Sequence, residues 1–181
     1  DKNSDVLLWA KEPQVKKGVE KTRINEIYLD KIKLNKSLKI TNHLEDLSEL
    51  DILFIVVPTQ YIQSTLRPLK KIIKKNCILV NCAKGIDIKS TSLISEVINK
   101  ILPGNKLAIM SGPNFALEIA LGKPTASLIA AQKISDAKFI ANLISSKTFR
   151  PYLSNDIIGA QICGAMKNIY AIGCGIIVGK N

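Results

Sequence analysis

The chain has 181 residues, of which 46% are hydrophobic and 23% charged, and its formal net charge is +11. This composition is that of an ordered globular protein and excludes an intrinsically disordered chain. The positive charge comes mostly from lysines spread along the sequence, with no arginine-rich or aromatic-interleaved stretch, so we interpret it as a solvated surface and expect no nucleic-acid partner.

The cysteines and the first residues bear on the compartment. Cys77, Cys82, Cys163 and Cys174 form no C-x-x-C pair, and the single histidine offers them no partner, so neither a metal site nor a disulfide is expected. The polar residues 1–5 do not resemble a signal peptide. We therefore expect a cytoplasmic protein with free thiols.

Apolar runs and helical spacing alternate along the chain. The strongest strand signal is 50–57, a continuous β-branched run of the kind buried on both faces of a parallel sheet. The full expectation is strands over 5–10, 38–41, 50–57, 77–82, 107–110, 125–131 and 149–153, helices over 11–21, 62–73, 93–101, 114–121 and 137–144, and one or two helical turns over 43–50. This order predicts an α/β fold with a Rossmann-like, mostly parallel sheet.

The pattern changes after Ser154. Residues 156–180 form one long helical pattern with Ser154 or Asn155 as its N-cap, so we place a domain boundary there, between 1–154 and 155–181. The helix is apolar but carries Lys167 near its middle, which favours a buried helix over a membrane span, and we expect no membrane insertion. The glycines of 173–179 are interpreted as a helix-packing feature.

A Rossmann domain opens with a strand and a G-x-G-x-x-G turn that holds the pyrophosphate of a dinucleotide. Nothing before Asp5 could supply either part. We therefore expect an incomplete dinucleotide-binding domain over 1–154, lacking its first strand and glycine-rich loop, followed over 155–181 by the first helix of an all-α domain.

Ligands of open α/β sheets bind beyond the carboxyl ends of the strands, and three clusters fall there. The segment 57–60 contains Pro58 and Thr59, where a helix cap is the plain alternative to a nucleotide contact. Lys84 precedes a permissive glycine and could bind a phosphate or polarise a carbonyl, although a surface lysine is the plain alternative. The segment 111–116 points a helix N-terminus at the ligand side, or is simply a strand–helix turn.

Two further positions carry candidate chemistry. Lys167 shares a helix face with the small residues Ala160, Cys163 and Gly164, so it is expected to be partly enclosed and suited to proton transfer; a lysine that reaches solvent is the plain alternative. Lys11 follows the first strand, where Rossmann folds read the adenosine ribose. The sequence does not choose between NAD and NADP.

Five ordered motifs carry a resemblance to a known family. They are Leu8-Trp9-Ala10-Lys11-Glu12-Pro13, Val57-Pro58-Thr59-Gln60, Ala83-Lys84-Gly85-Ile86-Asp87, Ser111-Gly112-Pro113-Asn114-Phe115-Ala116 and Gly164-Ala165-Met166-Lys167-Asn168. In order and spacing, over 5–180, the chain resembles bacterial NAD(P)-dependent glycerol-3-phosphate dehydrogenase. The resemblance implies reversible reduction of dihydroxyacetone phosphate to sn-glycerol 3-phosphate with NAD or NADP, for glycerophospholipid synthesis.

The resemblance also implies roles for individual residues. Lys167 matches the catalytic lysine that accepts the alcohol proton, and Lys84 matches a lysine in contact with substrate and cofactor. The other cofactor positions are Lys11, Pro58 and Ala116, and the other substrate positions are Gly112 and Asn114. Two residues depart from the family pattern: Asn114 stands in place of a small hydroxyl residue, and Lys11 in place of an arginine.

The two missing parts lead to a further expectation and to alternatives. Without a pyrophosphate loop or a complete helical domain, this polypeptide alone is expected to have little dehydrogenase activity. A non-catalytic remnant or partner-binding module is the main alternative, and a basic nucleic-acid-binding module is a more distant one. The resemblance leaves a homodimer open for the full-length enzyme.

Overall fold

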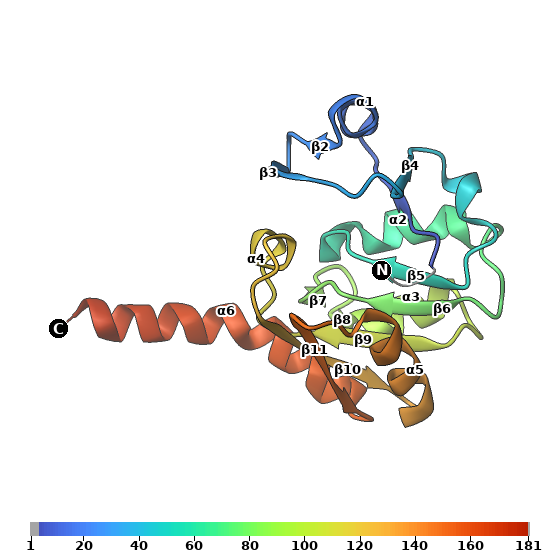
Figure 1. Cartoon of the computed structure of the whole chain (residues 1–181). Helices are drawn as coiled ribbons and strands as arrows, with labels where there is room; N and C mark the ends of the chain where they lie inside the picture. The colour runs from blue at the N-terminus through green and yellow to red at the C-terminus, as the bar shows by residue number, and fades with distance from the viewer. Residues whose placement is uncertain (1–3, 181) are drawn as a thin grey trace.

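The computed structural model describes residues 4–180, and its largest element is a five-stranded sheet in the order β11-β10-β9-β6-β5 (Figure 1). The strands are β5 (Ile52–Ile55), β6 (Ile78–Asn81), β9 (Leu107–Ser111), β10 (Thr125–Ala131) and β11 (Phe149–Ser154). Three neighbouring pairs are parallel, and the β9–β10 pair is antiparallel. The predicted α/β fold with a mostly parallel sheet is confirmed.

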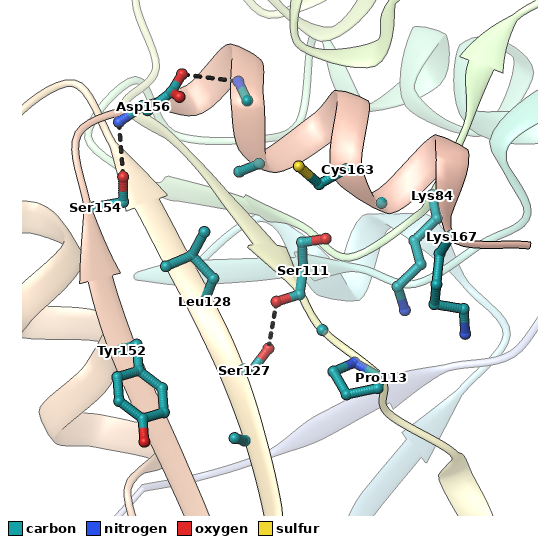
Figure 2. A pocket seen from close by; sticks show the side chains of 15 residues that line it. Lys84, Ser111, Pro113, Ser127, Leu128, Tyr152, Ser154, Asp156, Cys163 and Lys167 are labelled. Atoms are coloured by element: carbon teal, nitrogen blue, oxygen red, sulfur yellow. Dashed lines mark hydrogen bonds between the residues drawn. The ribbon is translucent and has the colours of Figure 1, made fainter. Parts of the chain in front are cut away.

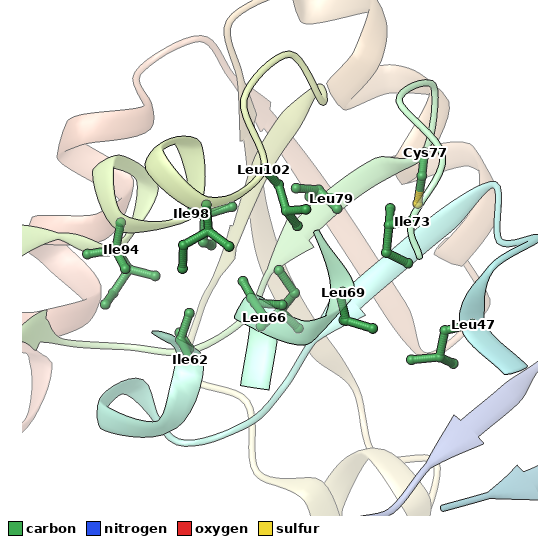
Figure 3. Packing of buried hydrophobic residues seen from close by; sticks show 13 residues of the cluster. Leu47, Ile62, Leu66, Leu69, Ile73, Cys77, Leu79, Ile94, Ile98 and Leu102 are labelled. Carbon is green, nitrogen blue, oxygen red and sulfur yellow. The ribbon is translucent and has the colours of Figure 1, made fainter. Parts of the chain in front are cut away.

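Helices cover both faces of this sheet because its strands are apolar on both sides. On one face, α2 (Ile62–Leu69) and α3 (Ile94–Ile101) enclose a core that includes Leu79, which is fully buried (Figure 3). On the other face, α5 (Ile134–Ile144) packs on the neighbouring Val80. Successive residues of a strand point to opposite faces, so β6 contributes to both cores.

The N-terminal part of the chain forms a sheet of its own. Strands β1 (Leu7–Trp9) and β4 (Lys39–Thr41) pair in parallel and, within the described residues, hydrogen-bond to no strand of the main sheet. The two strands predicted over 5–10 and 38–41 are thus present, and they form a separate parallel pair. Leu7 and Trp9 nevertheless pack against the main core, so the contact between the two sheets is made by side chains rather than by backbone hydrogen bonds.

Several short elements complete the structure. Helix α1 (Pro13–Thr22) begins with a proline, which suits the first turn of a helix. Two hairpins were not predicted: β2 (Ile24–Asn25) with β3 (Leu29–Lys33), and β7 (Ile86–Asp87) with β8 (Ser92–Leu93). The remaining elements are the 3-10 helices η1 (Leu44–Leu47) and η2 (Thr59–Tyr61) and the short helix α4 (Ala116–Ala120).

The last helix, α6 (Ile157–Gly179), begins on the sheet and then extends away from it (Figure 1). Its N-cap is Asp156, whose carboxylate accepts a hydrogen bond from the Gly159 amide at 2.7 Å, so the predicted caps Ser154 and Asn155 are wrong. Ser154 instead accepts a hydrogen bond from the Asp156 amide at 2.9 Å.

The prediction that α6 is a buried helix is also wrong for most of its length. Only Ala160 and Gln161 are buried, because only the first turns of α6 contact β9 and β10. Among the described residues, nothing lies within 4 Å of a methyl group built on Gly173, and the same holds at Gly175 and Gly179, so the expected close packing of these glycines is not found. By length and composition alone, α6 could cross a membrane, a test that core helices of other proteins also pass.

Candidate functional site

A cavity of about 560 Å³ lies where α6 crosses the ends of β9 and β10. Three of the candidate residues, Lys84, Gly112 and Lys167, line it. Figure 2 shows the Lys84 and Lys167 side chains side by side, at the opposite end of the cavity from Asp156. The two lysines therefore face one cavity.

A network of hydrogen bonds holds the turn that carries Lys84. The buried Asn81 at the end of β6 bonds with its side chain to both backbone groups of Ala83, at 3.0 and 3.3 Å. Thr59 donates to the Lys84 carbonyl at 2.7 Å. Gly85 has a φ of 131°, and a Cβ there would lie 3.2 Å from the Thr59 hydroxyl, so the turn requires a glycine, as expected.

The segment after β9 approaches β10 closely. A Cβ on Gly112 would lie 2.7 Å from Asn114 Oδ1 and 2.8 Å from the Ala126 carbonyl oxygen. Asn114 is not among the lining residues, but its Nδ2 donates to Ser127 Oγ at 3.2 Å, and Ser127 does line the cavity. Asn114 Oδ1 is buried without a hydrogen-bond partner. The segment thus offers an unused acceptor beside the cavity.

The first half of α6 forms the roof of the cavity. Its small residues Ala160, Cys163 and Gly164 line the cavity together with Lys167, as their shared helix face predicts. A Cβ on Gly164 would lie 2.7 Å from Ser111 Oγ, so the glycine allows the close approach of α6 to β9. Lys167 is half-buried, and its ammonium lies 5.1 Å from the centre of the Phe115 ring.

The electrostatics of the cavity are positive. Burial, and after it the nearby charge of Lys167, lower the pKa of Lys84. Asp156 is the one carboxylate among the lining residues described, and it lies at the far end in a hydrogen bond to the helix backbone. A cavity with two close lysines and no nearby carboxylate suits an anionic ligand such as a phosphate ester.

The other candidates, Lys11, Pro58 and Ala116, do not line the cavity. All three are exposed; Pro58 precedes η2 and Ala116 begins α4. The Lys11 ammonium lies 5.9 Å from the centre of the Tyr61 ring. The exposed Lys11 and the half-buried Lys84 lie along the strand ends and fit the anionic backbone of a dinucleotide, whereas no glycine-rich loop occurs among the described residues.

Several lining residues were not found by the sequence analysis, among them Ser127 and Tyr152. Ser127 is buried in the middle of β10, and Tyr152 lies on β11, paired in register with Leu128. Ser127 could have been noticed as a polar residue inside an apolar strand. Nothing in the local sequence marks Tyr152, because its place at the cavity depends on the pairing of β10 with β11.

The fold defines a class of protein: a Rossmann-type α/β domain, with a candidate ligand cavity at the ends of the strands. The chain belongs to the NAD-dependent glycerol-3-phosphate dehydrogenase family. Residues 1–137 match the N-terminal domain of that family, and residues 156–181 match its C-terminal domain. This membership favours the dehydrogenase reading over a partner-binding module.

Individual relatives agree with the family. The glycerol-3-phosphate dehydrogenase (NAD(P)+) of Hyphomonas neptunium is 39% identical over 175 residues, covering 97% of this chain and 52% of the relative. The protein of the same name from Paramagnetospirillum magneticum is 38% identical, with 97% and 64% covered. The chain therefore spans between about half and two thirds of the length of these curated relatives.

Solved structures give the same result. The glycerol-3-phosphate dehydrogenase of Coxiella burnetii superposes with a TM-score of 0.88 at 29% identity, covering 95% of this chain and 53% of that one. The glycerol-3-phosphate dehydrogenase of Plasmodium falciparum superposes with a TM-score of 0.90 at 25% identity, covering 99% and 52%. The likeness extends over nearly the whole chain.

Proposed function

We propose that this chain serves the reversible conversion of dihydroxyacetone phosphate to sn-glycerol 3-phosphate with NAD or NADP, in the cytoplasm and for glycerophospholipid synthesis. The observation that carries the proposal is the meeting of Lys84 and Lys167 at one cavity, in a chain of this family. We also propose that the dinucleotide-binding domain ends near residue 154 and that α6 begins the substrate domain.

Lys167 is the proton-transfer residue in this proposal. In the oxidation direction, the hydroxyl proton of glycerol 3-phosphate passes to the Lys167 amine; in the reduction direction, the Lys167 ammonium returns a proton to the carbonyl oxygen. NAD or NADP, when bound, accepts or supplies the hydride. Lys84 has its pKa lowered by burial and by Lys167, and it holds the substrate oxygens as a nearby point charge.

The remaining candidates bind and orient. Gly112 has no side chain, and this allows the segment after β9 to approach the backbone of β10 closely at the wall of the cavity. Asn114 has an unused buried acceptor, Oδ1, that a substrate hydroxyl can satisfy after a small movement. Lys11, Pro58 and Ala116 hold the cofactor from the strand ends.

A thermal-shift titration tests the proposal directly on this chain. A ligand present at about 100 times its Kd stabilises the folded state by roughly 2.7 kcal/mol, so dihydroxyacetone phosphate is expected to raise the melting temperature of the wild type. Lys84→Met and Lys167→Met remove the shift. Lys147→Met, at an exposed lysine outside the cavity, is the matched control and retains it.

The same titration with NADH and NADPH tests the cofactor, and the loss of NADH absorbance on adding dihydroxyacetone phosphate tests turnover. Little turnover is expected from the 181-residue polypeptide, since no G-x-G-x-x-G motif occurs in it. Dihydroxyacetone phosphate that leaves the melting temperature unchanged, or that stabilises the two cavity-lysine variants as much as the control, contradicts the proposed site.

A further inference from the structure

We propose that Gln161 is a positioning residue, which fixes α6 against α3 and thereby holds Lys167 beside Lys84. The inference rests on the proposed function of the two lysines. Gln161 is only 5% exposed and lies on α6, six residues before Lys167. It does not line the cavity, so any effect it has on the reaction must act through other residues.

The side chain of Gln161 is fully used in hydrogen bonds. Its Oε1 accepts from the Ser95 amide at 2.9 Å. Its Nε2 donates to Ser95 Oγ at 3.0 Å and to the Ile157 carbonyl, one turn earlier in α6, at 3.1 Å. The two partners in this contact are 66 residues apart in sequence, and Ser95 is itself 8% exposed.

The contact completes the N-terminus of α3. The residue at the N-cap of that helix is Leu93, which has no side-chain acceptor, and α3 has no local cap hydrogen bond. Ser95 is the second helical residue, whose amide a cap residue ordinarily satisfies. Gln161 therefore supplies from α6 the acceptor that the local sequence of α3 lacks.

Apolar packing alone does not fix the rotation of α6 about its axis. Its buried contact to the sheet is Ala160 against Ile109 and Ala130, with Ile157 and Leu128 packed against them, and hydrophobic contacts are non-directional. Hydrogen bonds prefer a narrow range of distances and angles, so the paired bonds to Ser95 select one rotation of the helix about its axis. That rotation turns Ala160, Gly164 and Lys167 toward the cavity.

The Gln161–Ser95 contact also holds the segment that carries Lys84. The segment from Lys84 runs through the β7–β8 hairpin directly into α3, so it is fixed by Thr59 near its start and by Gln161 at its end. One buried amide therefore links the helix that carries Lys167 to the segment that begins at Lys84. Without it, the two ammonium groups, which repel each other, are expected to move apart.

The test is the titration of Lys84 in the free protein, followed by NMR after reductive ¹³C-methylation of the lysines, with the Lys84 signal assigned by Lys84→Arg. Lys167→Met sets the reference, because it removes one of the two causes that lower the pKa of Lys84, and the pKa rises. Gln161→Met, of similar size but without the amide, is expected to raise the pKa of Lys84 as well. Gln132→Met, at an exposed glutamine on the surface, is the matched control and leaves it unchanged.

Gln161→Asn serves as a second variant if Gln161→Met does not fold. It keeps an amide but is one methylene shorter, so it cannot span to Ser95 while retaining its place on α6, and the pKa of Lys84 again rises. A folded Gln161 variant in which Lys84 titrates as in the wild type overturns the proposal. The measurement needs neither substrate nor cofactor, so its failure is distinct from a failure of the proposed function.

Discussion

Replacing Gly112 with alanine tests the closest backbone approach at the cavity wall. The new Cβ would lie 2.7 Å from Asn114 Oδ1, 2.8 Å from the Ala126 carbonyl oxygen and 3.1 Å from Ser127 Cα. The Asn114 side chain can move aside, but the other two atoms belong to the backbone of β10. Alanine therefore fits only if the segment after β9 and the strand β10 separate.

The expected loss of stability follows from these contacts. Overpacking of this kind costs about 1–3 kcal/mol. Replacing a glycine also restricts the unfolded chain, which returns about 0.4–1 kcal/mol where alanine tolerates the backbone. From the middle of each range the net loss is about 1.3 kcal/mol, and with a urea m value of about 2 kcal/mol/M the midpoint falls by roughly 0.6–0.7 M.

Equilibrium unfolding in urea, followed by circular dichroism, measures this shift. Gly18→Ala is the matched control: its Cβ would lie 3.6 Å from the Ile24 carbonyl oxygen, an ordinary contact, inside α1. Alanine there is expected to stabilise by about 1 kcal/mol through helix propensity. The two variants should therefore fall on opposite sides of the wild type. A Gly112→Ala midpoint at or above the wild-type value would refute the reasoning.

Three further predictions concern the thiols and α6. A disulfide reagent at pH 7.5 should label two thiols quickly in the native protein and four after unfolding. Burial raises the pKa of Cys77 to about 11 and that of Cys82 to about 12, so these two thiols react slowly in the folded state. A third thiol that reacts quickly would contradict this. The reactive pair is Cys163 and Cys174, and the unreactive pair is Cys77 and Cys82. Asp156→Ala should lower the free energy of unfolding, measured in thermal melts, by about 1 kcal/mol. Asp156→Asn should lower it less, since asparagine retains an acceptor for the Gly159 amide, and equal losses would exclude capping by this side chain. Phe115→Leu should remove the ring-current shift of the methylated Lys167 NMR signal, and an unchanged shift would show that the ring and ammonium are not in contact.

Much of the fold could be predicted because its strands are buried on both faces. The runs that form β5 and β6 are mostly apolar, and short runs of this kind are typical of strands buried on both faces of a parallel sheet. The β2–β3 hairpin could not be found in the same way, because most residues of Leu29–Lys33 are exposed and lysine-rich. Whether β1 and β4 join the main sheet depends on which strand lies beside them, and this information is not local.

The candidate site was predictable to the extent that it depends on strand ends and helix faces. Lys84 follows a buried strand, and Lys167 shares a helix face with small residues, so each could be named as a candidate before its place in the fold was known. The cap of α6 could not be assigned correctly, since Ser154, Asn155 and Asp156 can all cap a helix. Only the backbone geometry decides which carboxylate or hydroxyl reaches the Gly159 amide.

The electrostatics of the cavity connect substrate binding to the protonation of Lys84. The pKa of Lys84 is lowered from its ordinary value because its ammonium is partly buried and lies near Lys167. A phosphate dianion in the cavity acts in the opposite sense: it stabilises the ammonium and raises that pKa. At pH values between the pKa of Lys84 in the free protein and its pKa in the complex, binding is accompanied by proton uptake. The affinity for the phosphate falls as the pH rises through the pKa of Lys84 in the free protein, and it stops falling once Lys84 is also deprotonated in the complex. The repulsion between the Lys84 and Lys167 ammonium groups raises the free energy of the empty cavity. An anion relieves this repulsion and a neutral ligand of the same shape does not, so the repulsion makes the cavity selective for an anion.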